Sequence, residues 1–241
     1  MSMRFLLAAL LLLGGCSPAL SGDGDVTVEY PKVKKELRPM QTMLRKSGVL
    51  ERAARQAARV GHPPDDIVVR LKSCTDGTGY VTGEGVVELC LQDFVDTKKA
   101  IKDGGEKDIR GTMLGVAEGT LLHELGHALI DVRHLPVTGR EEDAADQFAV
   151  WQAIVGLKDP DIVLSDAYEY QIDNDLYEQT DDDEHGSDGQ RAVNLYCWLY
   201  GSEPKAWKHL VDGDPLTKYR AKLCRDEWKE LAYAWETLLA R

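Results

Sequence analysis

The chain has 241 residues and a formal net charge of −12 at pH 7. A chain of this length fits a single domain, and no internal repeat stands out. The excess of acidic residues argues against nucleic acid or an anionic lipid surface as the partner.

The first 15 residues have the pattern of a targeting segment. Arg4 precedes an apolar run from Phe5 to Leu13, which is too short to span a membrane stably. The residues Leu13-Gly14-Gly15-Cys16 that follow resemble the lipoprotein box of bacteria. The resemblance implies cleavage before Cys16, lipidation of Cys16, and durable anchoring in the cell envelope, facing the periplasm, with the outer membrane as the expected address. The alternative is ordinary secretion of a soluble protein after cleavage near Ala19.

Residues 16–30 are small and polar and contain glycine, so we predict a flexible tether here. Residues 31–241 are then one domain. Because the targeting segment contains only one of the 29 basic residues, Arg4, its removal leaves a net charge near −13.

Apolar residues recur at helical spacing between residues 31 and 60, which predicts packing helices. The runs 67–71 and 85–91 are rich in β-branched residues and predict two strands of a small sheet. Residues 98–111 are charged and contain a double glycine, so we expect a surface connection there.

Four cysteines follow Cys16, an even number in a chain with an export signal, and this favours disulfides. Three connectivities exist, and proximity in the sequence favours Cys74–Cys90 and Cys197–Cys224. Closing the 15 residues between Cys74 and Cys90 would add roughly 3 kcal/mol of stability. No CxxC motif occurs, which argues against a cysteine zinc site.

The apolar segment from Gly119 to Ile130 contains His123, Glu124 and His127. Histidines four residues apart lie one turn apart on one face of a helix, where both imidazoles can bind a zinc ion. Glu124 then lies beside the position of a zinc-bound water and can act as its base. This segment resembles the active-site helix of zincin metallopeptidases. The alternative is a buried helix whose histidines only satisfy hydrogen bonds.

Residues 140–151 predict a second helix with acidic residues in its first turns. Glu142 and Asp146 share one face. Glu142 is the candidate third zinc ligand, and Asp146 the candidate acceptor for the second ring N–H of His123. The pattern after HExxH resembles the gluzincin branch of the zincins, in which the two acids have these roles. Glu141 is the weaker ligand candidate, and all acids at a helix start also complement the helix dipole.

A polar loop with His185 leads into an apolar helix that carries Arg191 near its start. The acidic run 181–184 before it does not fit the calcium-loop template and is interpreted as a solvated loop. In gluzincins a downstream basic residue stabilises the oxyanion of the tetrahedral intermediate, so His185 and Arg191 are candidate catalytic residues. Alternatively, His185 is a solvated loop residue and Arg191 forms an ion pair with one of the loop acids.

Residues 205–241 predict two helices, the second with apolar residues at helical spacing. We expect this stripe in the core: Tyr219, Leu223, Trp228, Leu231, Trp235 and Leu238.

The motifs HELGH and EDAADQ, the segment from His185 to Gly201 and Cys224 together resemble an uncharacterised family of bacterial proteins described as "putative metallopeptidases". The resemblance extends from about Val33 to Trp228. It implies a zincin-like, mostly helical α+β fold with one zinc ion, and an enzyme that acts on a peptide or protein substrate. In zincins an edge strand beside the metal can pair with the substrate, and Val86–Leu91 is the candidate; the alternative, a plain core strand, fits this segment equally well.

The sequence thus predicts a zinc-dependent peptidase of the cell envelope. Two alternatives stay open. One is an envelope lipoprotein that binds zinc and has a binding or assembly role without turnover. The other is a zinc hydrolase of a non-peptide amide, for instance in the cell wall.

Overall fold

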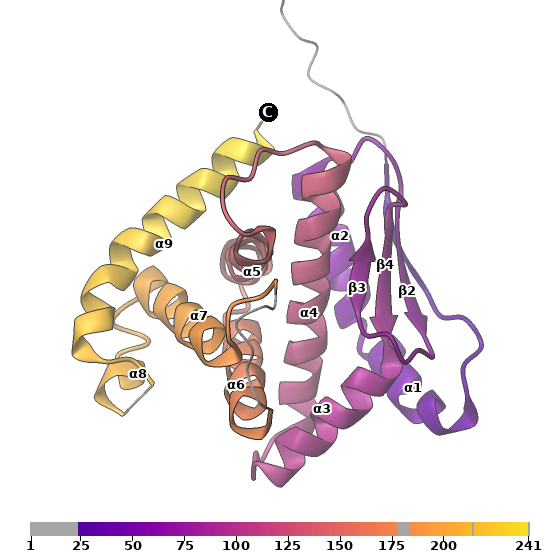
Figure 1. Ribbon diagram of the computed structural model, residues 1–241, viewed down its shortest axis with the longest axis horizontal. Coiled ribbons are helices and arrows are strands. Elements are labelled where there is room, and N and C mark those ends of the chain that lie inside the picture. Colours follow the sequence, from indigo (N-terminus) through magenta and orange to yellow (C-terminus); the bar gives the residue numbers. More distant parts are fainter. Residues whose placement is uncertain (1–23, 178–183, 214, 241) are drawn as a thin grey trace, which may run out of the picture.

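The computed structural model describes residues 24–177, 184–213 and 215–240. In these ranges the chain forms nine α-helices and a small mixed sheet, which confirms the predicted mostly helical α+β class (Figure 1). The strands are β1 (Val26–Glu29), β2 (Ile67–Lys72), β3 (Gly79–Val81) and β4 (Val86–Cys90). The helices are α1 (Arg38–Ser47), α2 (Val49–Gly61), α3 (Leu91–Asp103), α4 (Ile109–Val132), α5 (Glu141–Trp151), α6 (Asp161–Leu176), α7 (Asp188–Ser202), α8 (His209–Asp212) and α9 (Lys218–Leu239).

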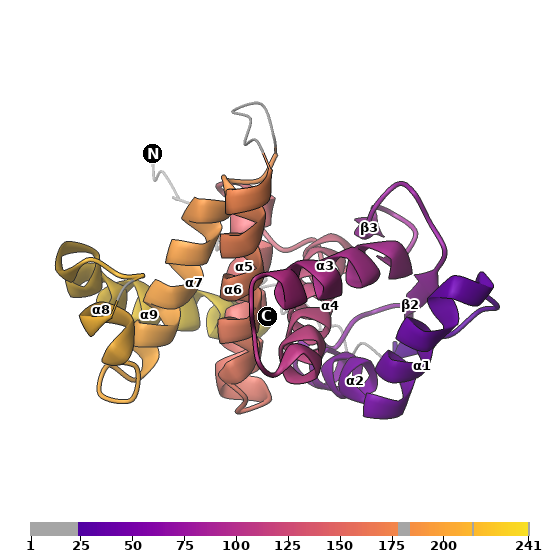
Figure 2. The ribbon, with the colours of Figure 1, turned by 90° about the horizontal axis from the view of Figure 1, so that it is seen from below.

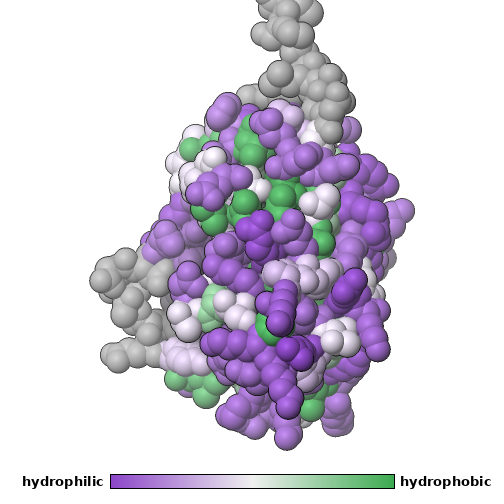
Figure 3. Space-filling view, turned by 90° about the vertical axis from the view of Figure 1, so that its right-hand side faces the viewer, coloured by the Kyte–Doolittle hydropathy of each residue, from purple (hydrophilic) through white to green (hydrophobic). Residues whose placement is uncertain are grey.

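The sheet has the strand order β1-β2-β4-β3. The first three strands are parallel, and β3 pairs antiparallel with β4, with Tyr80 opposite Val87. Along β2, Ile67, Val69 and Leu71 are buried while the residues between them are partly exposed, the alternation that a sheet with one covered face requires. Figure 3 views the molecule from the side of the sheet, and most of the residues on this face are hydrophilic.

Two predictions about strands differ from the structure. Val26–Glu29, inside the expected tether 16–30, forms β1, because its four residues pair in register with β2 and Val26 is buried. The predicted edge strand Val86–Leu91 is wrong as an edge: β4 lies between β2 and β3, and Leu91 already belongs to α3. The edge strands are β1 and β3. Strand β3 has only three residues, one of them a glycine, and is too short to be recognised from its composition.

The prediction of a surface connection over residues 98–111 is wrong at both ends, because α3 extends to Asp103 and α4 begins at Ile109. Helix α3 continues to Asp103, with its charged residues exposed and Ile101 fully buried. In α9 the expected core stripe is only partly buried: Tyr219 is 77% and Leu223 is 48% exposed, whereas Leu231 and Trp235 lie in the core. Tyr219 and Leu223 therefore lie on the solvent face of α9, whereas Cys224 on the opposite face is buried and bonded to Cys197 of α7.

Helix α4 lies at the centre of the molecule, between the sheet with α2 on one side and α5, α6 and α7 on the other (Figures 1 and 2). Its residues from Val116 to Ile130 are buried on nearly every face, except at Thr120, which explains why this segment is apolar all round. Gly126 permits the close approach of α5. A Cβ atom at this position would lie 3.1 Å from the Cα of Ala145 and 3.3 Å from the Cβ of Phe148.

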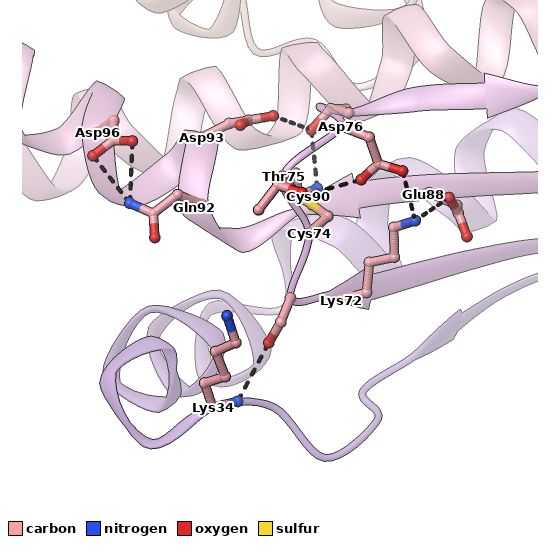
Figure 4. The surroundings of a disulfide bond; sticks show 12 residues. Lys34, Lys72, Cys74, Thr75, Asp76, Glu88, Cys90, Gln92, Asp93 and Asp96 are labelled. Atoms are coloured by element: carbon pink, nitrogen blue, oxygen red, sulfur yellow. Dashed lines mark hydrogen bonds and ion pairs between the residues drawn. A yellow bond between two sulfur atoms is a disulfide. The ribbon is translucent and has the colours of Figure 1, made fainter.

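Both predicted disulfides are present. Cys74–Cys90 links the loop after β2 to the end of β4, and Figure 4 shows it beside Lys72, which bridges the carboxylates of Asp76 and Glu88. Cys197–Cys224 links α7 to α9. The first bond thus closes the loop between β2 and β4 within the sheet region, and the second fixes the C-terminal helix to α7.

The targeting segment, the lipidation site Cys16 and most of the acidic run 181–184 lie outside the described residues. Among the described helices, none combines the length and the apolar character needed to cross a membrane.

Candidate metal centre

The imidazoles of His123 and His127 lie on the face of α4 that is turned toward the start of α5. Their Nε2 atoms are 3.2 Å apart. Glu142, in the first turn of α5, places its Oε2 atom 3.1 Å from Nε2 of His123 and 3.2 Å from Nε2 of His127. Helix periodicity in α4 and the close packing of α5 across it at Gly126 thus bring the three predicted ligands together (Figure 1).

These three atoms have the separations that a tetrahedral zinc ion requires. Zinc binds imidazole nitrogen and carboxylate oxygen at about 2.0–2.2 Å. Two ligands of a tetrahedron with bonds of that length are about 3.3 to 3.6 Å apart, close to the 3.1–3.2 Å found here. All three side chains are mostly buried. His123, His127 and Glu142 therefore fit one face of a zinc tetrahedron, with the fourth corner left for water or substrate.

Each imidazole is oriented by a second carboxylate. Nδ1 of His123 donates to Oδ1 of Asp146 at 2.8 Å, as predicted from the spacing of Glu142 and Asp146. Nδ1 of His127 donates to Oε1 of Glu141 at the same distance. With the proton on Nδ1, each ring presents the lone pair of Nε2 to the centre. Sequence reasoning considered Glu141 only as a ligand and missed this contact. The signal that could have indicated this contact is the position of Glu141 at the first residue of α5, one residue before the candidate ligand Glu142.

Competition between burial and hydrogen bonding sets the protonation of these groups. Burial alone would lower the pKa of His127, but its hydrogen bonds with Glu142 and Glu141 outweigh this and raise the pKa to about 9. Burial alone would raise the pKa of Glu142, but the three histidines around it hold it far below the usual range. The arrangement attracts positive charge, so protons and a metal cation compete for the same nitrogen atoms.

Arg191 of α7 lies behind Asp146. Its guanidinium donates two hydrogen bonds to the Asp146 carboxylate, at 3.0 and 2.7 Å, and its Cζ lies 4.1 Å from the centre of the Tyr170 ring. Burial would raise the pKa of Asp146, but His123 and Arg191 hold it well below the usual range. These contacts match the ion-pair alternative for Arg191, although the partner is Asp146 instead of a loop acid. Arg191 therefore orients His123 through Asp146.

His185 approaches the same centre from the segment before α7. Its Nε2 lies 2.8 Å from Oε2 of Glu142, and its side chain is 34% exposed. One ligand atom from each of His123, Glu142 and His185 can be chosen so that all three lie within 4.8 Å of one another. His185 is thus close enough to contact either a metal ion or a substrate oxygen bound beside it.

Glu124 is buried, with 8% of its surface exposed, and borders the cavity in front of the two histidines. Burial raises the pKa of its carboxyl group, while the nearby His123 and His127 act in the opposite direction. A carboxylate that is poorly solvated and close to the reacting position accepts a proton more readily than an exposed one. The position of Glu124 suits a general base.

The cavity in front of the centre has a volume of about 470 Å³. One wall comes from the edge strand β3 and its flanks, through Gly79, Tyr80 and Thr82. The Tyr80 hydroxyl donates to Oδ2 of Asp131 at 2.8 Å, which ties β3 to the end of α4. The free edge of β3 therefore lies beside the candidate ligands. Val86–Leu91 was the predicted edge strand for this position.

The cavity thus contains two histidines and a glutamate at ligand spacing, with a buried glutamate beside them, and is a candidate metal centre. Residues 30–239 match a family model whose description is "Putative metallopeptidase". The match covers most of the chain, and the chain belongs to this family. It matches no curated protein and no solved structure.

Proposed function

We propose that this protein is a zinc-dependent peptidase that hydrolyses peptide bonds. The observation that carries the proposal is the triangle of His123, His127 and Glu142, whose ligand atoms are 3.1–3.2 Å apart. Membership of the metallopeptidase family supports it. The ligand set of two imidazoles and one carboxylate suits zinc.

A bound zinc ion would polarise the scissile carbonyl and lower the pKa of a water molecule. Glu124, at the cavity wall, would accept a proton from the attacking water as the water oxygen bonds to the carbonyl carbon, and would pass this proton to the amine nitrogen as the C–N bond breaks. His185 donates a hydrogen bond to the oxyanion that develops on the carbonyl oxygen. Asp146 and Glu141 hold the imidazoles of His123 and His127 in place throughout.

We also propose that the substrate chain binds in an extended form along β3. The strand is the last of the sheet, so one side of its backbone has no strand partner within the described residues. Its flanking residues line the cavity that contains Glu124. Main-chain hydrogen bonds to such an edge orient a peptide without reading its sequence.

The cellular address follows from the first 16 residues alone. The basic residue, the short apolar run and the box that ends at Cys16 support export and lipid anchoring at Cys16. We therefore place the proposed peptidase in the bacterial envelope, facing the periplasm. Metabolic labelling with a fatty-acid analogue, compared between the wild type and Cys16→Ala, tests this address. Equal labelling of both proteins would contradict it.

Turnover is tested with a mixture of unstructured peptides, on zinc-loaded wild type and Glu124→Gln. We expect cleavage by the wild type and a loss of about 10²–10⁴-fold in the variant, with the zinc content unchanged. An active Glu124→Gln protein would contradict the mechanism. A wild type that holds zinc but cleaves no peptide would favour a non-catalytic zinc-binding role, or a non-peptide amide as substrate.

A further inference from the structure

A second, smaller cavity of about 180 Å³ adjoins the one in front of the candidate metal centre. The two cavities share four lining residues: Thr78, His123, Glu124 and His185. The smaller cavity continues from there between α3 and α6. A substrate held over His123 and Glu124 therefore has a side pocket directly beside the reacting bond.

The walls of this side pocket carry two carboxyl groups from different helices. Asp93 comes from the first turn of α3 and accepts a hydrogen bond from Oγ1 of Thr78 at 3.0 Å. Glu169 comes from α6 and accepts one from Oγ1 of Thr97 at 3.2 Å. In the described parts of the chain, neither carboxyl group forms an ion pair with a lysine or arginine.

One cation, Arg191, also borders the side pocket, but its charge is already matched. Its guanidinium forms two hydrogen bonds with Asp146 and stacks on the ring of Tyr170. Once this pair is set aside, the lining has the carboxyl groups of Asp93, Glu169 and Glu124. The imidazoles of His123 and His185 lie at the end that it shares with the larger cavity. Between α3 and α6, away from the histidines, the pocket therefore has two carboxyl groups without a lysine or arginine ion-pair partner in the described residues, and the charge of Arg191 offsets them only in part.

The size and the apolar part of the wall select among cations. A volume of 180 Å³ holds about six water molecules at roughly 30 Å³ each. A lysine side chain has five non-hydrogen atoms beyond Cα, which fits that space. Phe94 and Tyr170 border the pocket and can cover the methylene groups, while the carboxyl groups meet the ammonium group.

We propose that this side pocket binds a lysine side chain of the substrate next to the cleaved bond; this inference rests on the proposed peptidase function. Burial raises the pKa of Glu169 to about 7, with repulsion by Asp173 as a further cause. A bound ammonium group would relieve both effects by favouring the ionised carboxylate. The protein is therefore a peptidase with a preference for basic substrates.

The test uses two peptides that differ at one position, lysine or norleucine, where norleucine has nearly the same length and no charge. We expect the wild type to cleave the lysine peptide with a kcat/KM at least about tenfold higher. Glu169→Gln keeps the size of the side chain and should remove most of this ratio. Asp93→Asn should also reduce the ratio of the two kcat/KM values, and it provides the test if Glu169→Gln fails to fold. Asp96→Asn is the matched control, because Asp96 is an exposed acid on the same helix as Asp93.

Equal cleavage of both peptides, or an unchanged ratio in both variants, would overturn the lysine pocket and leave the proposed peptidase standing. If no peptide is cleaved, the peptidase function fails, and the pocket is then tested by NMR titration with Nα-acetyl-lysine amide and its norleucine counterpart. Tighter binding of the lysine compound, lost in Glu169→Gln, would support a cation site. Equal binding of the two compounds would overturn it.

Discussion

Helix α4 carries two clusters of buried acidic groups, one around Glu118 and one around His123 and His127. Each borders a cavity of nearly the same size, about 460 Å³ at Glu118 and about 470 Å³ at the histidines. Burial and cavity size therefore do not distinguish a structural cluster from a candidate catalytic one. The difference lies in which atoms face one another.

In the Glu118 cluster an arginine neutralises the carboxylates. Nε of Arg52 donates to Oε1 of Glu118 at 2.7 Å, and its NH2 group also contacts Oδ2 of Asp159 at 2.8 Å. In the other cluster, two imidazole nitrogens and a carboxylate oxygen converge without an arginine or lysine among them. A guanidinium cannot give up its proton and so closes the first cluster. Imidazoles can exchange a proton for a metal ion.

Among variants of the two clusters, we expect Asp146→Asn to have the largest effect, which is a loss of zinc affinity. The change weakens the acceptor that fixes the His123 ring, so the dissociation constant for zinc should rise about 10- to 100-fold. Competition with a chromophoric chelator measures this constant, and circular dichroism checks the fold. Asp143→Asn, an exposed acid on the same helix, is the control. Unchanged zinc affinity in Asp146→Asn would show that the contact does not orient a ligand.

Glu141→Gln should have a smaller effect of the same kind. The Glu141 side chain is 50% exposed, so water can replace part of its contact with Nδ1 of His127. We expect zinc affinity to fall by about threefold to tenfold, at or below the lower end of the range for such partners. A loss larger than that of Asp146→Asn would reverse the ranking of the two carboxylates and indicate that Glu141 itself binds the metal.

Glu118→Gln should lower stability and leave zinc affinity unchanged. The change removes a charged acceptor of Arg52, but the Arg52 side chain is 40% exposed, and solvent screens the pair. Burial also raises the pKa of Glu118, so part of the attraction only offsets desolvation. We expect the free energy of unfolding to fall by about 1 kcal/mol in urea titrations. A loss of zinc binding would mean that the two clusters are coupled.

The smallest effect concerns pH and Asp166, a buried residue of α6 between the two clusters. Burial raises its pKa well above the usual range, and its Oδ1 has no hydrogen-bond partner among the described residues. The folded protein therefore holds a proton that the unfolded chain releases above a pH of about 4, and stability falls as the pH rises from there.

Asp166→Asn removes this dependence. Compared with the wild type, its melting temperature should improve from pH 5 to pH 8, by a few degrees at most. Asp175→Asn, an exposed acid on the same helix, should show no such trend. An equal difference between Asp166→Asn and the wild type at both pH values would contradict the raised pKa.

The sequence predicted those parts of the site that follow from helix periodicity. His123 and His127, and Glu142 and Asp146, are each four residues apart, and this spacing alone determines their common face. The disulfides were predictable because each pair is local in sequence. Strand β1 and the edge strand β3 were not, because pairing partners distant in the sequence decide which short segment becomes a strand.

The contacts of the site residues depend on tertiary structure and could not be read from spacing. Arg191 and Asp146 are 45 residues apart, and Glu169 and Thr97 are 72 apart. No local pattern links such residues, because the packing of α7 and α6 against the metal helices brings them together. For the same reason, the sequence could indicate an ion pair for Arg191 but not that Asp146 is its partner.

The measurement that tests the central claim most directly is the zinc content of the purified protein by mass spectrometry, for the wild type and Glu142→Ala after reconstitution. We expect one zinc ion per chain in the wild type and loss of tight binding in Glu142→Ala, with Glu118→Gln behaving as the wild type. A wild type without zinc, or a Glu142→Ala protein that keeps it with undiminished affinity, would contradict the site built from His123, His127 and Glu142.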